Sequence, residues 1–243
     1  MSAFDGWVTI GITAYLRPLS LLRLESSIRQ RYPDCPVVVV DTGSNLSQAR
    51  NRLARAVTTP YLLLCEDDFE FIGTTRIEPL LDVLTHDPEV VGVGGVLLEP
   101  RGPHCWGHDY WPRGGEILAS PSRDPLRRTP AGVVYQTCQL IFNFGLYRRD
   151  LFERVPWDED LPLNEHHDFY FRVSRLGLGK MAVARGVAVR HHKDRPSEEY
   201  LCARQRNYID QANAKHGARF RTELRHEWVG DFASVETGKE VSP

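Results

Sequence analysis

The alternation of strand and helix patterns in the first hundred residues restricts the fold of this chain more than any other sequence feature. Four short apolar runs, each typical of a buried strand, are separated by segments with helical spacing. These runs are Val8 to Thr13, Val37 to Val40, Tyr61 to Cys65 and Val90 to Val96. Strands joined by helices pair in parallel through right-handed crossovers. The order therefore predicts an α/β fold with a Rossmann-like, mostly parallel central sheet and helices on both faces.

The first helix has clear limits in the sequence. Pro18 suits the first turn of a helix, and the proline that follows Tyr32 disfavours helical geometry at that residue. We expect Leu19, Leu22 and Ile28 to lie close to one face of this helix.

Two further stretches carry distinct expectations. Val37 to Val40 is an unbroken β-branched run, which predicts a strand buried on both faces of a parallel sheet. The stretch from Glu99 to Gly132 is rich in Pro, Gly, Arg and aromatic residues and predicts a long loop or irregular insertion. The elements expected after it are strands at 136–144, 180–184 and 187–190, and helices at 149–154, 165–176 and from Ser197 towards His216.

Composition limits the classes of function. The formal net charge is -2, so the chain has no overall basic field of the kind that drives nonspecific nucleic-acid binding. The five cysteines contain no CxxC pair, which argues against zinc-ribbon and disulfide frameworks and predicts reduced thiols. We see neither a signal peptide nor an apolar run of membrane-spanning length, so we expect a cytoplasmic protein.

Three carboxylates follow the third predicted strand directly. Ligands of open α/β sheets bind at the carboxyl ends of strands, and oxygen ligands suit Mg²⁺ or Mn²⁺ together with substrate phosphates. Alternate residues of an extended segment point the same way, so Glu66 and Asp68 are expected to face one site. Asp67 is expected to point elsewhere, to a backbone or sugar partner. The alternative is a solvated turn without a specific role.

A histidine ends a later predicted strand. Imidazole is a reasonable ligand for Mn²⁺ beside carboxylates, so His191 is a candidate to complete a metal site with Asp68. Lys193 follows and is a candidate to neutralise a diphosphate. The alternative reading is a pair of solvated surface residues.

Acidic and imidazole side chains crowd the start of the helix expected at 165–176. Acids at a helix start are favoured by the helix dipole, so this cluster has a purely structural reading. The functional reading makes Asp168 or Glu165 a general base.

The ordered set of motifs is fairly specific. It comprises Val8-Thr9-Ile10 with Arg17, Val37 to Ser44, Thr58 to Phe69, Phe142-Asn143-Phe144, His166 to Phe169, and Val187 to His191. This set resembles the family 2 glycosyltransferases of the GT-A fold and is most similar to the β-1,4-N-acetylgalactosaminyltransferase branch that builds gangliosides. Two residues depart from the family pattern. Glu66 replaces the first aspartate of the Asp-x-Asp motif, and His166 follows Glu165 where many members have an aspartate base.

The resemblance implies a role for each motif. It assigns the metal, Mn²⁺ or Mg²⁺, to Asp68 and His191 with Glu66, and the catalytic base to Asp168, with Glu165 as the other candidate. It assigns the nucleotide-sugar to Asp41, Arg17, Glu66, Asp67 and Lys193. The acceptor is expected at Trp106, Trp111, Asn143 and His166, because aromatic faces stack on sugars or bases. The alternative for the two tryptophans is that they pin a long loop to the core.

The function expected from this resemblance is inverting, metal-dependent transfer of a hexose or N-acetylhexosamine from a UDP-sugar to an acceptor hydroxyl. The acceptor would be a glycan, a small molecule or, given the basic segment at 196–230, a nucleic acid. We expect one domain over residues 1–230, with a nucleotide-sugar half at 8–98, an acceptor and catalytic half at 99–195, and a polar tail at 231–243. A bacterial or viral origin is expected. The alternatives are a nucleotidyltransferase acting on a sugar phosphate and an inactive nucleotide- or carbohydrate-binding module.

Overall fold

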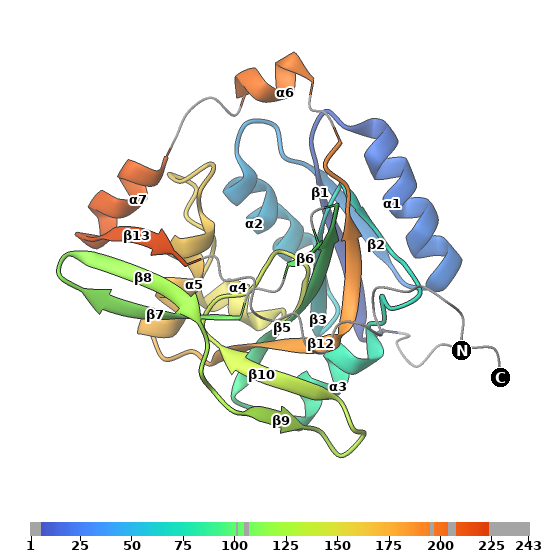
Figure 1. Ribbon diagram of the computed structural model, residues 1–243. Helices are drawn as coiled ribbons and strands as arrows, with labels where there is room; N and C mark the ends of the chain where they lie inside the picture. The colour runs from blue at the N-terminus through green and yellow to red at the C-terminus, as the bar shows by residue number, and fades with distance from the viewer. Residues whose placement is uncertain (1–5, 101, 105–106, 195–196, 204–207, 224–243) are drawn as a thin grey trace.

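The structure is a computed structural model that describes residues 6–100, 102–104, 107–194, 197–203 and 208–223. A ten-stranded mixed sheet forms its centre, and a three-stranded sheet lies beside it (Figure 1). The central strands are β1 (Val8–Ala14), β2 (Val37–Asp41), β3 (Tyr61–Glu66), β4 (Phe69–Glu70), β5 (Val90–Glu99), β6 (Gly102–His104), β9 (Leu126–Arg128), β10 (Val134–Cys138), β11 (Gly145–Arg148) and β12 (Lys180–His191). The smaller sheet contains β7 (His108–Arg113), β8 (Glu116–Pro121) and β13 (Arg219–Thr222).

The strand order confirms the expected α/β architecture. The sheet runs β2-β1-β3-β11-β5-β12-β10-β9, and β1 pairs in parallel with both β2 and β3, as β12 does with β5. Within these parallel strands, β11 inserts antiparallel between β3 and β5, while β10 and β9 add antiparallel pairs beyond β12. The sequence had not indicated β11.

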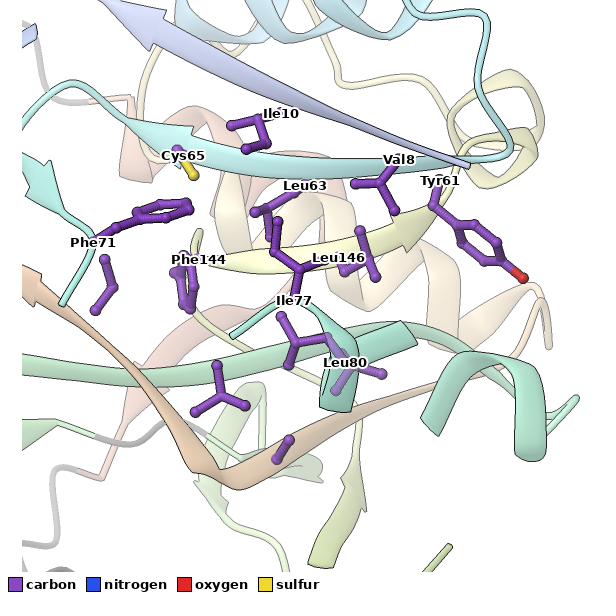
Figure 2. Packing of buried hydrophobic residues seen from close by; sticks show 14 of the residues in the cluster. Val8, Ile10, Tyr61, Leu63, Cys65, Phe71, Ile77, Leu80, Phe144 and Leu146 are labelled. Carbon is purple, nitrogen blue, oxygen red and sulfur yellow. The ribbon is translucent and has the colours of Figure 1, made fainter. Parts of the chain in front are cut away.

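Helices cover both faces of the central sheet. They are α1 (Pro18–Arg31), α2 (Leu46–Ala56), α3 (Glu78–His86), α4 (Asp150–Arg154), α5 (His166–Arg175), α6 (Glu198–Ala203) and α7 (Ile209–His216). Residues of α1 and α3 pack with Ile10, Leu63 and Leu146 in one buried cluster (Figure 2). Residues of α2, α4 and α5 belong to a second cluster with Leu62 and Val183. Each face of the sheet therefore has its own core.

The buried face of α1 differs from the expectation. Leu24 and Ile28 are fully buried, whereas Leu19 is 80% exposed and Leu22 is 59% exposed. At about 100° per residue, Leu19 and Ile28 point to opposite sides of the helix. The prediction that these three residues share one face was wrong.

The prediction that Val37 to Val40 is buried on both faces of the sheet was also wrong. β2 is the outermost strand on its side of the sheet, and Val39 is 38% exposed. A β-branched run shows that a segment is a strand, but it does not show how many neighbours the strand has.

The stretch expected to be a loop contains strands β6 to β9. Gly114 and Gly115 join β7 to β8 with φ of +54° and +82°. A two-residue hairpin turn of this kind needs positive φ at both central residues, which glycine adopts without steric cost. The Gly-Gly pair therefore marks a hairpin, and the prediction of an irregular insertion was wrong.

Two helices stand where one was expected near the C-terminal end. The Ser197 side chain accepts a hydrogen bond from the Tyr200 N–H at 3.2 Å and so caps α6, and α7 ends before Gly217 in the left-handed region. The tail expected at 231–243 lies outside the described residues. Within the part of the chain that is described, no helix has both the length and the apolar character needed to cross a membrane.

Candidate functional site

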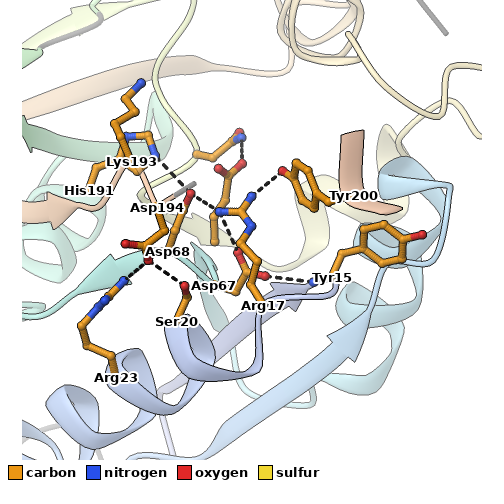
Figure 3. A network of polar contacts seen from close by, with 12 residues as sticks. Tyr15, Arg17, Ser20, Arg23, Asp67, Asp68, His191, Lys193, Asp194 and Tyr200 are labelled. Atoms are coloured by element: carbon orange, nitrogen blue, oxygen red, sulfur yellow. Dashed lines mark hydrogen bonds and ion pairs between the residues drawn. The ribbon is translucent and has the colours of Figure 1, made fainter. Parts of the chain in front are cut away.

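The end of β3 places two buried carboxylates at the carboxyl edge of the sheet. The Asp67 side chain accepts a hydrogen bond from the Tyr15 N–H at 2.9 Å, just beyond the end of β1 (Figure 3). The partner of Asp67 is thus a backbone group. Burial raises the pKa of Asp67 to about 6, with the neighbouring carboxylates adding to the effect and Arg17 opposing it.

Asp68 and His191 meet at this edge. Their side chains approach to 3.4 Å between Oδ2 and Nε2. The pairing of β4 with β12 causes the approach, since Phe69 lies opposite His191 and the His192 N–H donates to the Asp68 carbonyl at 2.9 Å. Burial opposes both charges, yet the hydrogen bond and charge between the two groups lower the pKa of Asp68 and raise that of His191.

The pair fits a divalent cation that keeps most of its coordination for phosphate and water. Asp68 Oδ1 is buried without a hydrogen-bond partner among the described residues, so one carboxylate oxygen is left for a cation. No group of three or more His, Cys, Asp or Glu side chains in those residues is arranged to hold a metal. Glu66 is therefore not joined to the pair, contrary to expectation, because Arg50 at 3.2 Å and Asn143 hold its Oε1.

Arg17 supplies the positive charge beside the two aspartates. Its guanidinium donates to Asp68 and lies 3.5 Å from Asp67 Oδ1. It also donates to the hydroxyl of Tyr200 on α6, and its carbon lies 4.4 Å from the centre of the Tyr200 ring. Burial alone would lower the pKa of Arg17, but the carboxylates raise it, so the group stays protonated. Figure 3 shows this contact, which joins Arg17 near the beginning of the chain to Tyr200 on α6.

A small pocket opens beside these residues, at the carboxyl ends of β1, β2 and β3. Its lining consists of Thr13, Tyr15, Arg17, Thr42, Leu46, Glu66 and Asp67. Asp41 precedes Thr42 and is exposed, and its side chain accepts a hydrogen bond from the Gly43 N–H at 2.7 Å. The pocket therefore contains Arg17, Glu66 and Asp67 from the expected nucleotide-sugar set, with Asp41 beside it.

A larger pocket of about 400 Å³ lies next to His191. Its lining includes Glu99, Arg190, His191, His192 and Lys193. Lys193 forms an ion pair with Glu99 at 3.0 Å, and its side chain is 57% exposed. Its ammonium group therefore lies beside His191.

Arg50 is a site residue that we did not single out from the sequence. It is 2% exposed, contacts both Glu165 and Glu66, and its guanidinium carbon lies 4.5 Å from the centre of the Trp157 ring. Arg50 shares the buried face of α2 with Leu46, Ala49 and Leu53 at helical spacing. A charged residue at helical spacing from Leu46, Ala49 and Leu53 was the signal that could have identified it.

The two candidate carboxylate bases have different surroundings. Asp168 is fully buried, and its carboxylate oxygens lie 2.8 Å from Arg172, 2.6 Å from Lys215 and 2.8 Å from His216. Glu165 is 2% exposed. Burial would raise its pKa, but Arg50 and then His166 hold that pKa well below its ordinary value. The structure thus connects Glu165, but not Asp168, to the carboxyl edge through Arg50.

The expected acceptor residues are dispersed. Asn143 is buried and donates to Glu66, whereas Trp111 lies on β7 in the smaller sheet and is 50% exposed. His166 is partly buried, with its ring 6.2 Å from that of Trp157. Trp106 lies outside the described residues.

Solved structures of known proteins share this architecture. S. aureus TarS 1-349 in complex with UDP-GlcNAc superposes with a TM-score of 0.57 at 12% sequence identity, over 84% of this chain and 63% of that one. GalNAc-T7 with UDP, GalNAc and Mn²⁺ gives a TM-score of 0.52 at 12% identity, over 77% of this chain and 44% of that one. The protein has the GT-A glycosyltransferase fold.

Sequence relatives of this GT-A protein carry a more specific name. Mouse β-1,4 N-acetylgalactosaminyltransferase 2 is 29% identical over 90% of the chain, and human β-1,4 N-acetylgalactosaminyltransferase 1 is 29% identical over 86%. The chain spans about half the length of these curated relatives, 46% and 45% respectively. No protein-family model matches the sequence. These relatives are mammalian, so the expected bacterial or viral origin has no support, and neither does a nucleic-acid acceptor.

Proposed function

We propose that this protein transfers N-acetylgalactosamine or N-acetylglucosamine from a UDP-sugar to a hydroxyl group of a glycan. The single observation that carries this proposal is the Asp68–His191 pair at the carboxyl edge of the sheet. The names of the relatives and of TarS and GalNAc-T7 support the choice of sugar and nucleotide. We further propose that the protein belongs to family 2. We also propose a cytoplasmic location, because its five cysteines contain no CxxC pair and fit reduced thiols.

The residues around the pair have complementary roles in this proposal. A divalent cation, Mn²⁺ or Mg²⁺, held by Asp68 and His191 would neutralise the charge that the diphosphate gains as it leaves. Arg17 and Lys193 flank these two residues and are suited to bind the same phosphates. Glu66 lines the small pocket and Asp41 precedes Thr42 of its lining, so we assign Asp41 to the base and Glu66 to the ribose. Trp111 and Asn143 remain our candidates for the acceptor side.

The reaction we propose is inverting. The acceptor oxygen attacks the anomeric carbon on the face opposite the diphosphate, while a base on the protein removes the acceptor proton. The transition state then resembles an oxocarbenium ion, and a UDP-sugar with an α-linkage yields a β-linked product.

The test is release of UDP from UDP-GalNAc and UDP-GlcNAc, with and without Mn²⁺ or Mg²⁺. The proposal expects metal-stimulated release by the wild type and its loss in Asp68→Ala. A matched control is Asp34→Ala, an exposed carboxylate just before β2, at the opposite edge of the sheet. Pyrophosphate release would indicate a nucleotidyltransferase, and UDP binding without turnover would indicate an inactive module. Either result overturns the proposal.

A further inference from the structure

The start of α5 offers three groups that could accept a proton: Glu165, His166 and Asp168. A general base must come within hydrogen-bond distance of the proton it removes. Asp168 has no exposed surface, and the side chains of Arg172, Lys215 and His216 lie within 2.8 Å of its oxygens. An acceptor hydroxyl therefore cannot come within hydrogen-bond distance of this carboxylate.

Glu165 is also enclosed. Its Oε1 accepts a hydrogen bond from the Arg50 guanidinium and also lies 3.0 Å from His166 Nδ1. Its side chain is 2% exposed, so an acceptor hydroxyl has little access to it. Its contacts suit it to hold other groups in place.

His166 has the open position that the two carboxylates lack. Its side chain is 26% exposed, and the edge-on contact with Trp157 restricts the ring. The carboxylate of Glu165 selects the tautomer with the proton on Nδ1, which leaves the lone pair on Nε2. Nε2 has no hydrogen bond within the described residues and is not among their buried, unpaired polar atoms. It is therefore accessible to a small molecule.

His166 is also connected to the carboxyl edge of the sheet. Arg50 binds Glu165 with one nitrogen and lies 3.2 Å from Glu66 with the other. Glu66 lines the small pocket beside Arg17. The chain from Glu66 through Arg50 and Glu165 to His166 is thus continuous, and the open imidazole lies at its outer end.

We propose that His166 is the general base of the transfer reaction and that Glu165 is its positioning residue. Nε2 takes the proton of the acceptor hydroxyl while the bond between acceptor oxygen and anomeric carbon forms. The bond from that carbon to the diphosphate breaks, and its electron pair leaves with UDP. Glu165 stabilises the resulting imidazolium, as a carboxylate does for histidine in hydrolytic triads, and the proton then passes to water. This inference rests on the proposed function, and it replaces Asp168 as the base.

The experiment compares two neighbouring histidines. His167 packs on Phe220 and contacts Thr222, so it faces the smaller sheet. We expect His166→Gln to slow metal-stimulated UDP release from UDP-GalNAc and UDP-GlcNAc by about 10²- to 10⁴-fold, the usual range for loss of a general base. His167→Gln should retain wild-type turnover. Both variants should bind UDP with wild-type affinity by calorimetry, which reports on folding of the site.

Two further measurements separate chemistry from structure. Added imidazole should restore part of the activity of His166→Gly and should leave His167→Gln unchanged. Glu165→Gln should lower kcat with little change in KM for the UDP-sugar, because the tautomer of His166 is no longer fixed.

The outcomes distinguish this inference from the function on which it rests. If the wild type and His167→Gln release UDP and His166→Gln does so within about threefold of them, the base assignment is wrong and the proposed function stands. The same holds if His166→Gln keeps its activity and Asp168→Asn loses it, which would return the role to Asp168. If the wild type releases UDP from neither donor, the proposed function fails and the base assignment fails with it.

Discussion

Replacement of Arg50 by methionine should reduce the free energy of unfolding by about 3–5 kcal/mol, the usual cost of breaking a buried ion pair. The structure supports a value of this size because Arg50 and Glu165 each have side chains only 2% exposed. Methionine would fill much of the space above the Trp157 ring but cannot neutralise Glu165. The remaining contact of 3.0 Å with His166 favours the lower end of the range.

Urea and thermal unfolding of Arg50→Met, Glu165→Gln and the double variant provide the assay. For a chain of this size, the single arginine variant should melt roughly 6–20 °C below the wild type. The double variant should cost less than the sum of the two single variants, because an amide can be buried more easily than an unpaired carboxylate. Arg55→Met changes an exposed arginine on the same helix and should stay within about 0.5 kcal/mol of the wild type.

The pH dependence gives an independent check of the mechanism. In the wild type the pKa of Glu165 is lowered, so its ion pair stabilises the fold above the ordinary pKa of 4.5 and is lost as pH falls through the folded value. In Arg50→Met the unpaired carboxyl can take up a proton, so its stability deficit should shrink as pH falls. A loss below about 1 kcal/mol, or full additivity in the double variant, would refute the reasoning.

Three further predictions concern the metal pair, a buried histidine and a close backbone contact. Asp68→Asn should abolish the stimulation of UDP release by Mn²⁺, because an amide is a poorer cation ligand than a carboxylate. His167 has its pKa lowered from 6.5 to about 4, chiefly by burial, so the unfolded chain binds the extra proton between those values. Stability should fall by about 3 kcal/mol as pH drops through that window, and His167→Gln should remove this slope. Gly95→Ala should cost about 1–3 kcal/mol, since the new Cβ would lie 2.8 Å from the Val187 carbonyl oxygen.

Each of these three has a measurement that would contradict it. Full metal stimulation in Asp68→Asn, measured by UDP release, would remove Asp68 from the metal site. Unfolding curves between pH 4 and 6.5 that are parallel for the wild type and His167→Gln would contradict the assigned pKa. Gly186→Ala is the control for Gly95→Ala because its Cβ would meet open space, and equal stabilities of these two variants would contradict the steric argument.

Local patterns predicted most of the elements around the candidate site. Pro18, the Asn45 side chain that caps α2, and Gly177 after α5 mark helix ends through their own backbone and side-chain chemistry. The run from Tyr61 to Cys65 indicated a buried strand, and its carboxyl end carries the acidic residues. Such features depend on neighbours in sequence, so the sequence alone was sufficient to reveal them.

The segments whose structure differed from the prediction depend on neighbours in space rather than in sequence. No pattern in the chain indicated that β2 has a partner on only one side, or that β11 would insert between β3 and β5. The Leu19 and Leu22 side chains are apolar but are 80% and 59% exposed, so their exposure followed from the placement of α1.

The amino-acid sequence was enough to establish the alternation of strands and helices and the carboxylates that follow β3, because hydrophobic periodicity and local turn chemistry act over a few residues. Which charged groups meet depends on the folded chain. Asp68 and His191 come together because β4 pairs with β12, and Arg50 reaches Glu165 across 115 residues of chain. Asp168 is enclosed because α7 places Lys215 and His216 against it. Burial and pairing of charges arise from contacts between distant segments, so spacing along the chain cannot reveal them.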